Sequence, residues 1–195
     1  MVYKQPLSMK KILSIIFLGL IVASNTMAYE ELNYQIVEKN KIYEIRKYSN
    51  RLVVETATSN ENSGFRKLFN YISGNNEKNE EIKMTTPVTE IKKGDNMVMQ
   101  FYLPSKFNKE NIPDPSNSNV KISTMKAGYY AVITYSGRNS ENNFIKHKNI
   151  LEEELKKNNI SILSSAIKAS YNSPFTLPMM RRNEAMYKID FKTAT

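Results

Sequence analysis

Apolar and polar residues alternate along several short segments of this chain, and this spacing predicts β-strands. Eight segments show the pattern: residues 42–48, 52–58, 83–91, 97–103, 120–125, 129–135, 166–171 and 185–191. Short turn sequences separate several of them, such as Ser49-Asn50, Lys93-Gly94-Asp95-Asn96 and Ala127-Gly128. Strands joined by short turns pair antiparallel. We therefore expect 42–48 to pair with 52–58, 83–91 with 97–103, and 120–125 with 129–135.

Two other segments have helical spacing. The first, from Phe65 to Gly74, places apolar residues at i, i+3, i+4 and i+7, the spacing of one buried face: Phe65, Leu68, Phe69 and Ile72. Gly74 is placed to end this helix. The second helix is expected to begin after the capping residue Ser140 and to run to about Lys157. Its predicted buried face contains Phe144, Leu151 and Leu155.

The order strand-strand-helix-strand-strand thus occurs twice along the chain. A polar linker, residues 105–119 with Pro113 and Pro115, separates the two halves. Each amphipathic helix needs a sheet face to cover, so the pattern predicts an α+β fold of about eight strands and two packed helices, in a pseudo-duplicated plan.

Residues 1–28 have the layout of a cleavable secretory signal peptide. Lys10 and Lys11 precede the apolar run 12–23, and Thr26 and Ala28 occupy the positions before the cleavage site. The run is shorter than the ~20 residues that span a bilayer, so no stable membrane anchor is expected after cleavage. Residues 29–195 are long enough for a single domain. We expect a periplasmic or secreted protein.

Charge and cysteine content narrow the function. The chain carries a formal charge of +9, and without its three leader lysines 25 basic residues remain against 19 acidic ones, or +6. Acids and lysines are interspersed, as in residues 78–83 and 152–157, which is typical of a solvated surface and argues against nucleic-acid binding. The chain has no cysteine, which excludes disulfides, thiol catalysis and thiolate ligation of a metal.

The segment from Tyr171 to Glu184 concentrates unusual residues in one connection: Tyr-Asn-Ser-Pro-Phe-Thr-Leu-Pro-Met-Met-Arg-Arg-Asn-Glu. Its two prolines exclude a helix and a central strand, so the loop holds an aromatic and apolar surface in one place. Two interpretations stay open. The loop caps one end of the fold, or it lines a groove for a flat apolar ligand, with Arg181 and Arg182 available for carboxylates.

Six segments carry a resemblance to a known family, in the family's order: Tyr43-Glu-Ile-Arg-Lys-Tyr48, the helix from Phe65 to Gly74, Met84-Thr-Thr-Pro-Val88, Phe101-Tyr-Leu-Pro104, Tyr135-Ser-Gly137 and the closing run from Tyr171 to Glu184. In these segments the chain resembles the SOUL haem-binding proteins, and the match runs from about Tyr34 to Asp190. The resemblance implies a distorted antiparallel β-barrel with helices packed outside. It also implies a ligand groove beside the first helix and the proline-containing loop, at Phe65, Phe69, Tyr171 and Phe175. Met179 and Met180 would extend its apolar wall, and Arg181 would bind carboxylates.

The cofactor that this resemblance implies is haem or another tetrapyrrole, held without a covalent bond. Two residues are candidate haem ligands: Tyr171, and His147, which is the single histidine and falls at the rim of the second helix's buried face. In some SOUL proteins a histidine nearer the N-terminal strands is the proposed ligand, and this chain has none there. The predicted partner is therefore a small apolar or amphiphilic ligand.

We expect an exported, non-enzymatic carrier or scavenger of tetrapyrroles. Two alternatives stay open, because the duplicated plan also resembles the effector-binding domains of bacterial regulators. One is a small-ligand-binding protein without haem affinity. The other is a hydrolase that uses Glu55 or Glu90, although the sequence shows no catalytic constellation.

Overall fold

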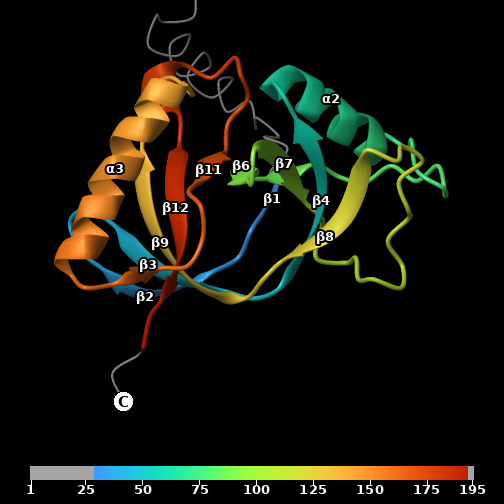
Figure 1. Cartoon of the computed structure of the whole chain (residues 1–195). Coiled ribbons are helices and arrows are strands. Elements are labelled where there is room, and N and C mark those ends of the chain that lie inside the picture. Colours follow the sequence, from blue (N-terminus) through green and yellow to red (C-terminus); the bar gives the residue numbers. More distant parts are fainter. Residues whose placement is uncertain (1–28, 193–195) are drawn as a thin grey trace, which may run out of the picture.

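The computed structural model describes residues 29–192 and is shown in Figure 1. The predicted signal peptide, residues 1–28, lies outside the described residues. The elements are, in chain order, β1 (Glu30–Glu31), β2 (Gln35–Lys39), β3 (Glu44–Tyr48), β4 (Arg51–Thr58), α2 (Glu61–Ile72), β5 (Thr85–Thr86), β6 (Val88–Lys93), β7 (Asn96–Tyr102), β8 (Val120–Met125), β9 (Gly128–Tyr135), α3 (Glu141–Lys157), β10 (Ser161–Ile162), β11 (Ile167–Ser170), the 3-10 turn η1 (Pro178–Met180) and β12 (Asn183–Asp190). The predicted strand-strand-helix-strand-strand plan is present twice.

Ten strands form one antiparallel sheet in the order β2-β3-β9-β12-β11-β6-β7-β4-β8, with β10 paired to β12. The α+β class is confirmed, but the prediction of a closed barrel is wrong, because β2 and β8 remain at opposite ends of the sheet. Strand β2 is largely exposed and carries Glu38 and Lys39. Charged residues of this kind are typical of an edge that stays unpaired. A separate parallel pair joins β1 to β5.

Two of the predicted hairpins are also wrong. Strand β3 pairs with β9 and β4 pairs with β8, so each half of the chain supplies an outer strand to the other half. The two short links lie side by side, where the Ala127 N–H donates to Asn50 Oδ1 at 2.8 Å. Alternation defines which face of a strand is buried, but it does not identify the partner strand. The β6–β7 hairpin and the antiparallel β11–β12 pair, which is joined by the proline-containing loop, are present.

This exchange gives the sheet an approximate two-fold arrangement about the β11–β6 pair. Outward from that pair, β12 corresponds to β7, β9 to β4, and β3 to β8. Helix α3 packs on β9 and β12, and α2 packs on β4 and β7, so each helix covers one half of the same face (Figure 1). The floor between the helices is formed by β11 and β6.

Three clusters of buried side chains hold these layers together. One lies under α3 and includes Phe144, Leu151 and Leu155, the buried face predicted for that helix. A second lies under α2. The third, which includes Tyr48, Val53 and Tyr102, occupies the opposite face of the sheet, because neighbouring residues of one strand point to opposite sides. No helix within residues 29–192 is long and apolar enough to cross a bilayer.

Helix α2 buries two of the four residues predicted for its buried face, Leu68 and Ile72, whereas the prediction for Phe65 and Phe69 is wrong. It begins at Glu61, where Asn60 Oδ1 accepts from the Ser63 N–H at 2.8 Å, and it buries Gly64, Leu68, Tyr71 and Ile72. Phe65 and Phe69 are 41% and 47% exposed. A Cβ on Gly64 would lie 3.0 Å from Thr58, so the glycine lets the helix approach β4 closely. The rings of Phe65 and Phe69 therefore lie at the partly exposed edge of the helix and do not point into the core.

This placement predicts different effects for two neighbouring substitutions. Leu68→Ala removes a fully buried side chain and should lower the free energy of unfolding by about 2–5 kcal/mol. Phe69→Ala removes a half-exposed ring and should lower it by less than about 1 kcal/mol. Urea denaturation of both variants tests this, and equal losses would contradict the helix orientation.

Candidate functional site

A groove opens between α2 and the loop of residues 172–181, which we call the proline loop. It has a volume of about 500 Å³. Its walls are Phe65, Arg66 and Phe69 of α2, Val88, Glu90 and Met99 of the sheet, and Pro174 and Arg181 of the proline loop, with Glu61, Asn62, Asn139, Ser170 and Asn172 completing the lining. We call this site the α2 groove. It lies in the size range of small-molecule sites.

The aromatic wall of the α2 groove is ordered by ring packing. The rings of Phe65 and Phe69 stack with centroids 5.9 Å apart and planes 14° from parallel. Phe65 also meets the buried ring of Phe101 edge-on, at 5.1 Å. Residues four apart on a helix lie on the same face, so the two phenylalanines form one continuous aromatic surface.

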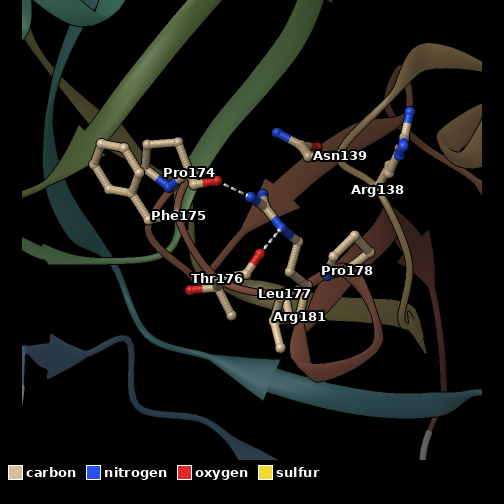
Figure 2. A pocket seen from close by; sticks show the side chains of 8 residues that line it. All are labelled: Arg138, Asn139, Pro174, Phe175, Thr176, Leu177, Pro178 and Arg181. Atoms are coloured by element: carbon tan, nitrogen blue, oxygen red, sulfur yellow. Dashed lines mark hydrogen bonds between the residues drawn. The ribbon is translucent and has the colours of Figure 1, made fainter.

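A second cavity, of about 430 Å³, lies under the proline loop and is shown in Figure 2. We call it the loop cavity, and it shares Asn139, Pro174 and Arg181 with the α2 groove. Arg181 Nε donates to Thr176 O at 2.9 Å, and its Nη2 donates to Pro174 O. These bonds use two of the five N–H donors of the guanidinium. Arg181 therefore holds the loop in shape besides facing the groove.

Asn139 stands where the α2 groove and the loop cavity meet. Its Oδ1 is buried and has no hydrogen-bond partner among the described residues. Buried polar atoms are nearly always paired, and an unpaired one commonly marks a site that water or a ligand completes. The side chain has both a carbonyl and an amino group, so it can serve either a donor or an acceptor.

A third cavity, of about 480 Å³, lies on the other side of the floor beside α3, and we call it the α3 groove. Phe144 and Ile145 of α3 and Met97 of β7 contribute to its apolar wall. Glu90 lines both the α2 groove and the α3 groove. The two grooves are therefore related by the duplication of the fold and share one acidic residue at their boundary.

Glu90 and its neighbour Lys168 form an ion pair on the floor between the grooves. Lys168 Nζ lies 3.5 Å from Glu90 Oε1 and also pairs with Glu61 at the start of α2. Burial raises the pKa of Glu90, although the charge of Lys168 opposes this. Burial lowers the pKa of Lys168, but its bond to Glu61 and the charge of Glu90 outweigh that effect and raise it. The Glu90 carboxylate is thus located between the α2 groove and the α3 groove and lines both.

Glu55, the other glutamate considered for hydrolysis, lines neither the α2 groove nor the α3 groove. It lies on the opposite face of β4 from the helix-covered Val54, and its Oε2 accepts from Gln100 Nε2 at 2.6 Å and from Lys93 Nζ at 2.9 Å. Alternation along a strand did not determine which face of the sheet either glutamate occupies. In the structure Glu90 lies on the face that the helices cover, and Glu55 lies on the opposite face.

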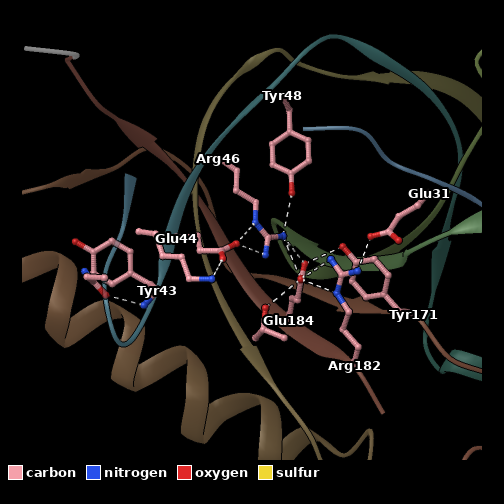
Figure 3. A network of polar contacts seen from close by, with 11 residues as sticks. Glu31, Tyr43, Glu44, Arg46, Tyr48, Tyr171, Arg182 and Glu184 are labelled. Atoms are coloured by element: carbon pink, nitrogen blue, oxygen red, sulfur yellow. Dashed lines mark hydrogen bonds and ion pairs between the residues drawn. The ribbon is translucent and has the colours of Figure 1, made fainter. Parts of the chain in front are cut away.

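Tyr171 belongs to a buried polar network centred on Glu184, shown in Figure 3. The Tyr171 hydroxyl donates to Glu184 Oε2 at 2.8 Å, and the Arg182 guanidinium lies over its ring at 3.8 Å. Burial raises the pKa of Tyr171, and the charge of Glu184 raises it further. The prediction that Tyr171 lines the groove needs correction: Ser170 points into the α2 groove, and the next residue points to the other face of the sheet.

Glu184 itself is fully buried and accepts hydrogen bonds from three further side chains. Arg46 donates at 3.1 Å to each of its oxygens, Arg182 at 2.9 and 3.0 Å, and Thr134 at 3.1 Å. Two guanidinium groups and two hydroxyls thus surround one carboxylate. Arg182, predicted as a carboxylate-binding residue, is committed to this internal network.

The remaining predicted site residues lie outside the α2 groove. Phe175 lines the loop cavity, while Met179 and Met180 project from η1 into solvent. His147 stacks on Tyr135 with ring centroids 4.0 Å apart, and its Nδ1 donates to Asn143 O at 2.8 Å. It is half-buried at the rim of α3, and it is not among the residues that line the three cavities. Of the predicted set, the groove therefore brings together Phe65, Phe69 and Arg181.

Sequence reasoning missed several groove residues, among them Arg66, Val88, Met99 and Asn139. Val88 and Met99 pack in the apolar cluster under α2, so their spacing predicts core residues and does not show that they also line a groove. Arg66 could be placed only from the orientation of α2, which the apolar pattern of that helix obscured. Asn139 follows Arg138 in a short connection before α3, where polar residues are expected in any case.

Comparisons with known proteins agree on the family and on the fold. The chain matches a family model described as SOUL heme-binding protein over residues 29–188. It is 33% identical over 159 residues to Heme-binding protein 2 of Mus musculus, which covers 73% of this chain and 75% of that protein. The C-terminal domain of EcmrR has a TM-score of 0.57 at 12% identity, covering 80% of this chain and 98% of that one. A structure described as a hydrolase from Listeria innocua has a TM-score of 0.55 at 10% identity, covering 79% and 94%. These two structures show a shared fold alone.

The Glu184 network predicts a large difference between two acidic positions. Glu184→Gln removes the central carboxylate, so that among residues 29–192 the buried Arg46 keeps only Glu44 and the half-buried Arg182 keeps only Glu31 as charged partners. The substitution should lower the free energy of unfolding by about 3–5 kcal/mol. Glu31→Gln removes the exposed partner of Arg182 and should lower it by less than about 1 kcal/mol. Chemical denaturation of both variants measures the difference, and a similar small loss in each would show that the network contributes little.

Proposed function

This chain belongs to the SOUL haem-binding protein family, and from that premise we propose that it is an exported carrier or scavenger that binds haem or a related tetrapyrrole in the α2 groove. The family and the mouse relative support tetrapyrrole binding in general terms. The predicted signal peptide supports export. The residues that line the α2 groove support this location for the binding site and the contacts that it would make with a tetrapyrrole.

The observation that carries the proposal is the exposed aromatic pair. Helix α2 already packs on the sheet through Leu68, Tyr71 and Ile72, so the rings of Phe65 and Phe69 are not needed to hold it in place. A flat conjugated ring covers such a stacked surface with favourable apolar and aromatic contact. Val88, Met99 and Pro174 extend the apolar wall on the side of the sheet and of the proline loop.

The polar groups of the groove suit the carboxylates that tetrapyrroles carry. Arg66 and Arg181 both line it, and a guanidinium binds a carboxylate through two parallel hydrogen bonds. Asn139 adds an amide at the inner end, where its buried oxygen has no partner among the described residues. The residues present therefore fit the apolar face and the acidic edge of the ligand.

The candidate haem ligands do not fit equally well. The Tyr171 hydroxyl donates a hydrogen bond to Glu184 on the other face of the sheet. His147 packs against Tyr135 and does not line the α2 groove. We therefore propose that this site holds the ring through apolar and carboxylate contacts, without an axial bond from either residue. When bound, haem would supply its own redox and ligand chemistry.

A second candidate function is favoured by Glu90. This carboxylate is largely buried and faces both grooves, and its one ion pair within residues 29–192 is a long one, 3.5 Å to Lys168. A buried carboxylate beside aromatic rings suits an apolar cation, so a protein that binds small cationic amphiphiles without haem affinity remains the alternative. Hydrolysis through Glu90 is the less favoured use of the same residue.

Haemin titration of residues 29–195, followed by the Soret band, tests the main proposal. We expect a saturable one-to-one shift and, in Phe65→Ala/Phe69→Ala, about tenfold weaker binding or more, because about 1.4 kcal/mol of contact corresponds to a factor of ten. His147→Ala is the matched control and should bind like the unchanged protein. A loss confined to His147→Ala would move the site to α3.

The absence of a saturable shift would reject tetrapyrrole binding. The same protein should then be tested with apolar cations by thermal stabilisation, and Glu90→Gln should abolish any stabilisation that they give. Stabilisation that survives Glu90→Gln would also reject the alternative.

Export predicts a defined mature terminus. Full-length chain produced in a Gram-negative host should appear in the periplasmic fraction, with Tyr29 as its first residue, because Thr26 and Ala28 suit the signal peptidase. Intact-mass measurement distinguishes this species from unprocessed chain. Retention of residues 1–28 in all of the recovered protein would contradict the proposal of export.

A further inference from the structure

The three most exposed large apolar side chains among residues 29–192 lie in the proline loop, together with Leu177. Phe175 is 93% exposed, Met179 78%, Met180 69% and Leu177 58%. Soluble proteins seldom leave so many large apolar groups together in water unless the patch contacts something. We propose that the proline loop docks the protein on the surface of a lipid bilayer with anionic headgroups, with these four side chains entering the interface.

The loop is built to hold these side chains outward. Pro174 and Pro178 restrict the backbone, and Arg181 donates to two loop carbonyls, as Figure 2 shows. The Gly137 N–H donates to Pro178 O at 2.9 Å, which ties the loop to the end of β9. The exposure is therefore a feature of an organised loop.

Several backbone groups of the loop are already hydrogen-bonded within it. The N–H groups of Thr176, Met180 and Arg181 donate to carbonyls within the loop, and that of Phe175 donates to Ser173 Oγ. Both prolines lack an N–H, and the carbonyls of Pro174 and Thr176 accept from Arg181. Because an unpaired backbone group is costly in an apolar medium, this internal pairing favours insertion of the loop into the interface.

A ligand in the grooves does not account for the exposure. Met179 and Met180 line neither the α2 groove nor the loop cavity, so a bound small molecule would leave them in contact with water. A bilayer covers side chains that project from a convex loop in different directions, and it needs no matching concave surface. The inference therefore does not depend on tetrapyrrole binding.

The charges beside the loop complement anionic lipid. The proline loop contains Arg181 and no acid, and the exposed Arg138 lines the loop cavity. The nearby acids are paired or directed elsewhere, because Glu31 and the buried Glu184 pair with Arg182 and Glu141 lines the α3 groove. Basic residues near the surface of an anionic membrane favour binding.

The chain contains no tryptophan, so a single Phe175→Trp substitution in residues 29–195 gives one reporter in the loop. With vesicles of phosphatidylcholine and phosphatidylglycerol, its emission should move to shorter wavelength, and lipids brominated on their acyl chains should quench it. Leu163→Trp is the matched control, because Leu163 is 58% exposed, like Leu177, but lies outside the loop. The control should show neither effect.

Flotation of unlabelled protein with the same vesicles gives the second measurement. Met179→Ser/Met180→Ser should bind about tenfold more weakly or worse, because apolar surface no longer leaves water, whereas Leu163→Ser should bind normally. Arg138→Gln should weaken binding to anionic vesicles. Unchanged thermal unfolding would show that each variant is folded.

Three outcomes would overturn the proposal. The first is an unshifted Phe175→Trp emission with anionic vesicles. The second is an equal response from the Leu163→Trp control. The third is a blue shift that appears without vesicles and rises with protein concentration, which would assign the loop to contact with a second copy of the chain.

Discussion

The buried carboxylate of Glu184 is the interaction on which the geometry of the candidate site depends. It joins Arg46 of β3, Thr134 of β9 and Tyr171 at the end of β11, so that strands from both halves of the chain meet at one charge. Burial of an ion is unfavourable unless its hydrogen bonds are satisfied, and here donors reach both oxygens. Because the Tyr171 side chain is fixed on one face of the sheet, Ser170 is directed into the α2 groove and the proline loop leaves the sheet beside α2.

Much of the fold could be predicted from the sequence, because local signals determine local structure. The N-cap Ser140 of α3, the glycine-containing β6–β7 turn and the two-proline loop were all visible as residue types at defined spacings. Strand partners were less accessible. The Ser49-Asn50 link suggests a hairpin, yet β3 pairs with β9, 80–88 residues away, and β4 pairs with β8, 64–74 residues away. Nothing in their alternation distinguishes the two choices.

The candidate site was partly predictable for a related reason. Periodicity locates the apolar side of α2 to within one residue position, and four apolar residues spaced for one face indicate a buried stripe. Gly64 was the signal that sequence reasoning missed: its lack of a side chain brings the helix onto Thr58 and turns Phe65 and Phe69 outward. Likewise, a tyrosine in a family motif suggested contact with ligand, and only the position of Glu184 shows that its hydroxyl points inward.

The geometry also bears on how tightly the α2 groove would hold the tetrapyrrole proposed for it. Micromolar affinity corresponds to about 8 kcal/mol, which equals roughly 320 Å² of apolar surface removed from water at about 25 cal/mol per Å². Two half-exposed phenylalanines, Val88, Met99 and Pro174 with the facing side of a tetrapyrrole supply area on that scale, but association itself opposes binding by several kcal/mol. Contacts to Arg66 and Arg181 must therefore offset much of that loss. A site of this kind, without an axial bond from His147 or Tyr171, favours moderate affinity and ready release, which suits a carrier more than an enzyme that retains its haem.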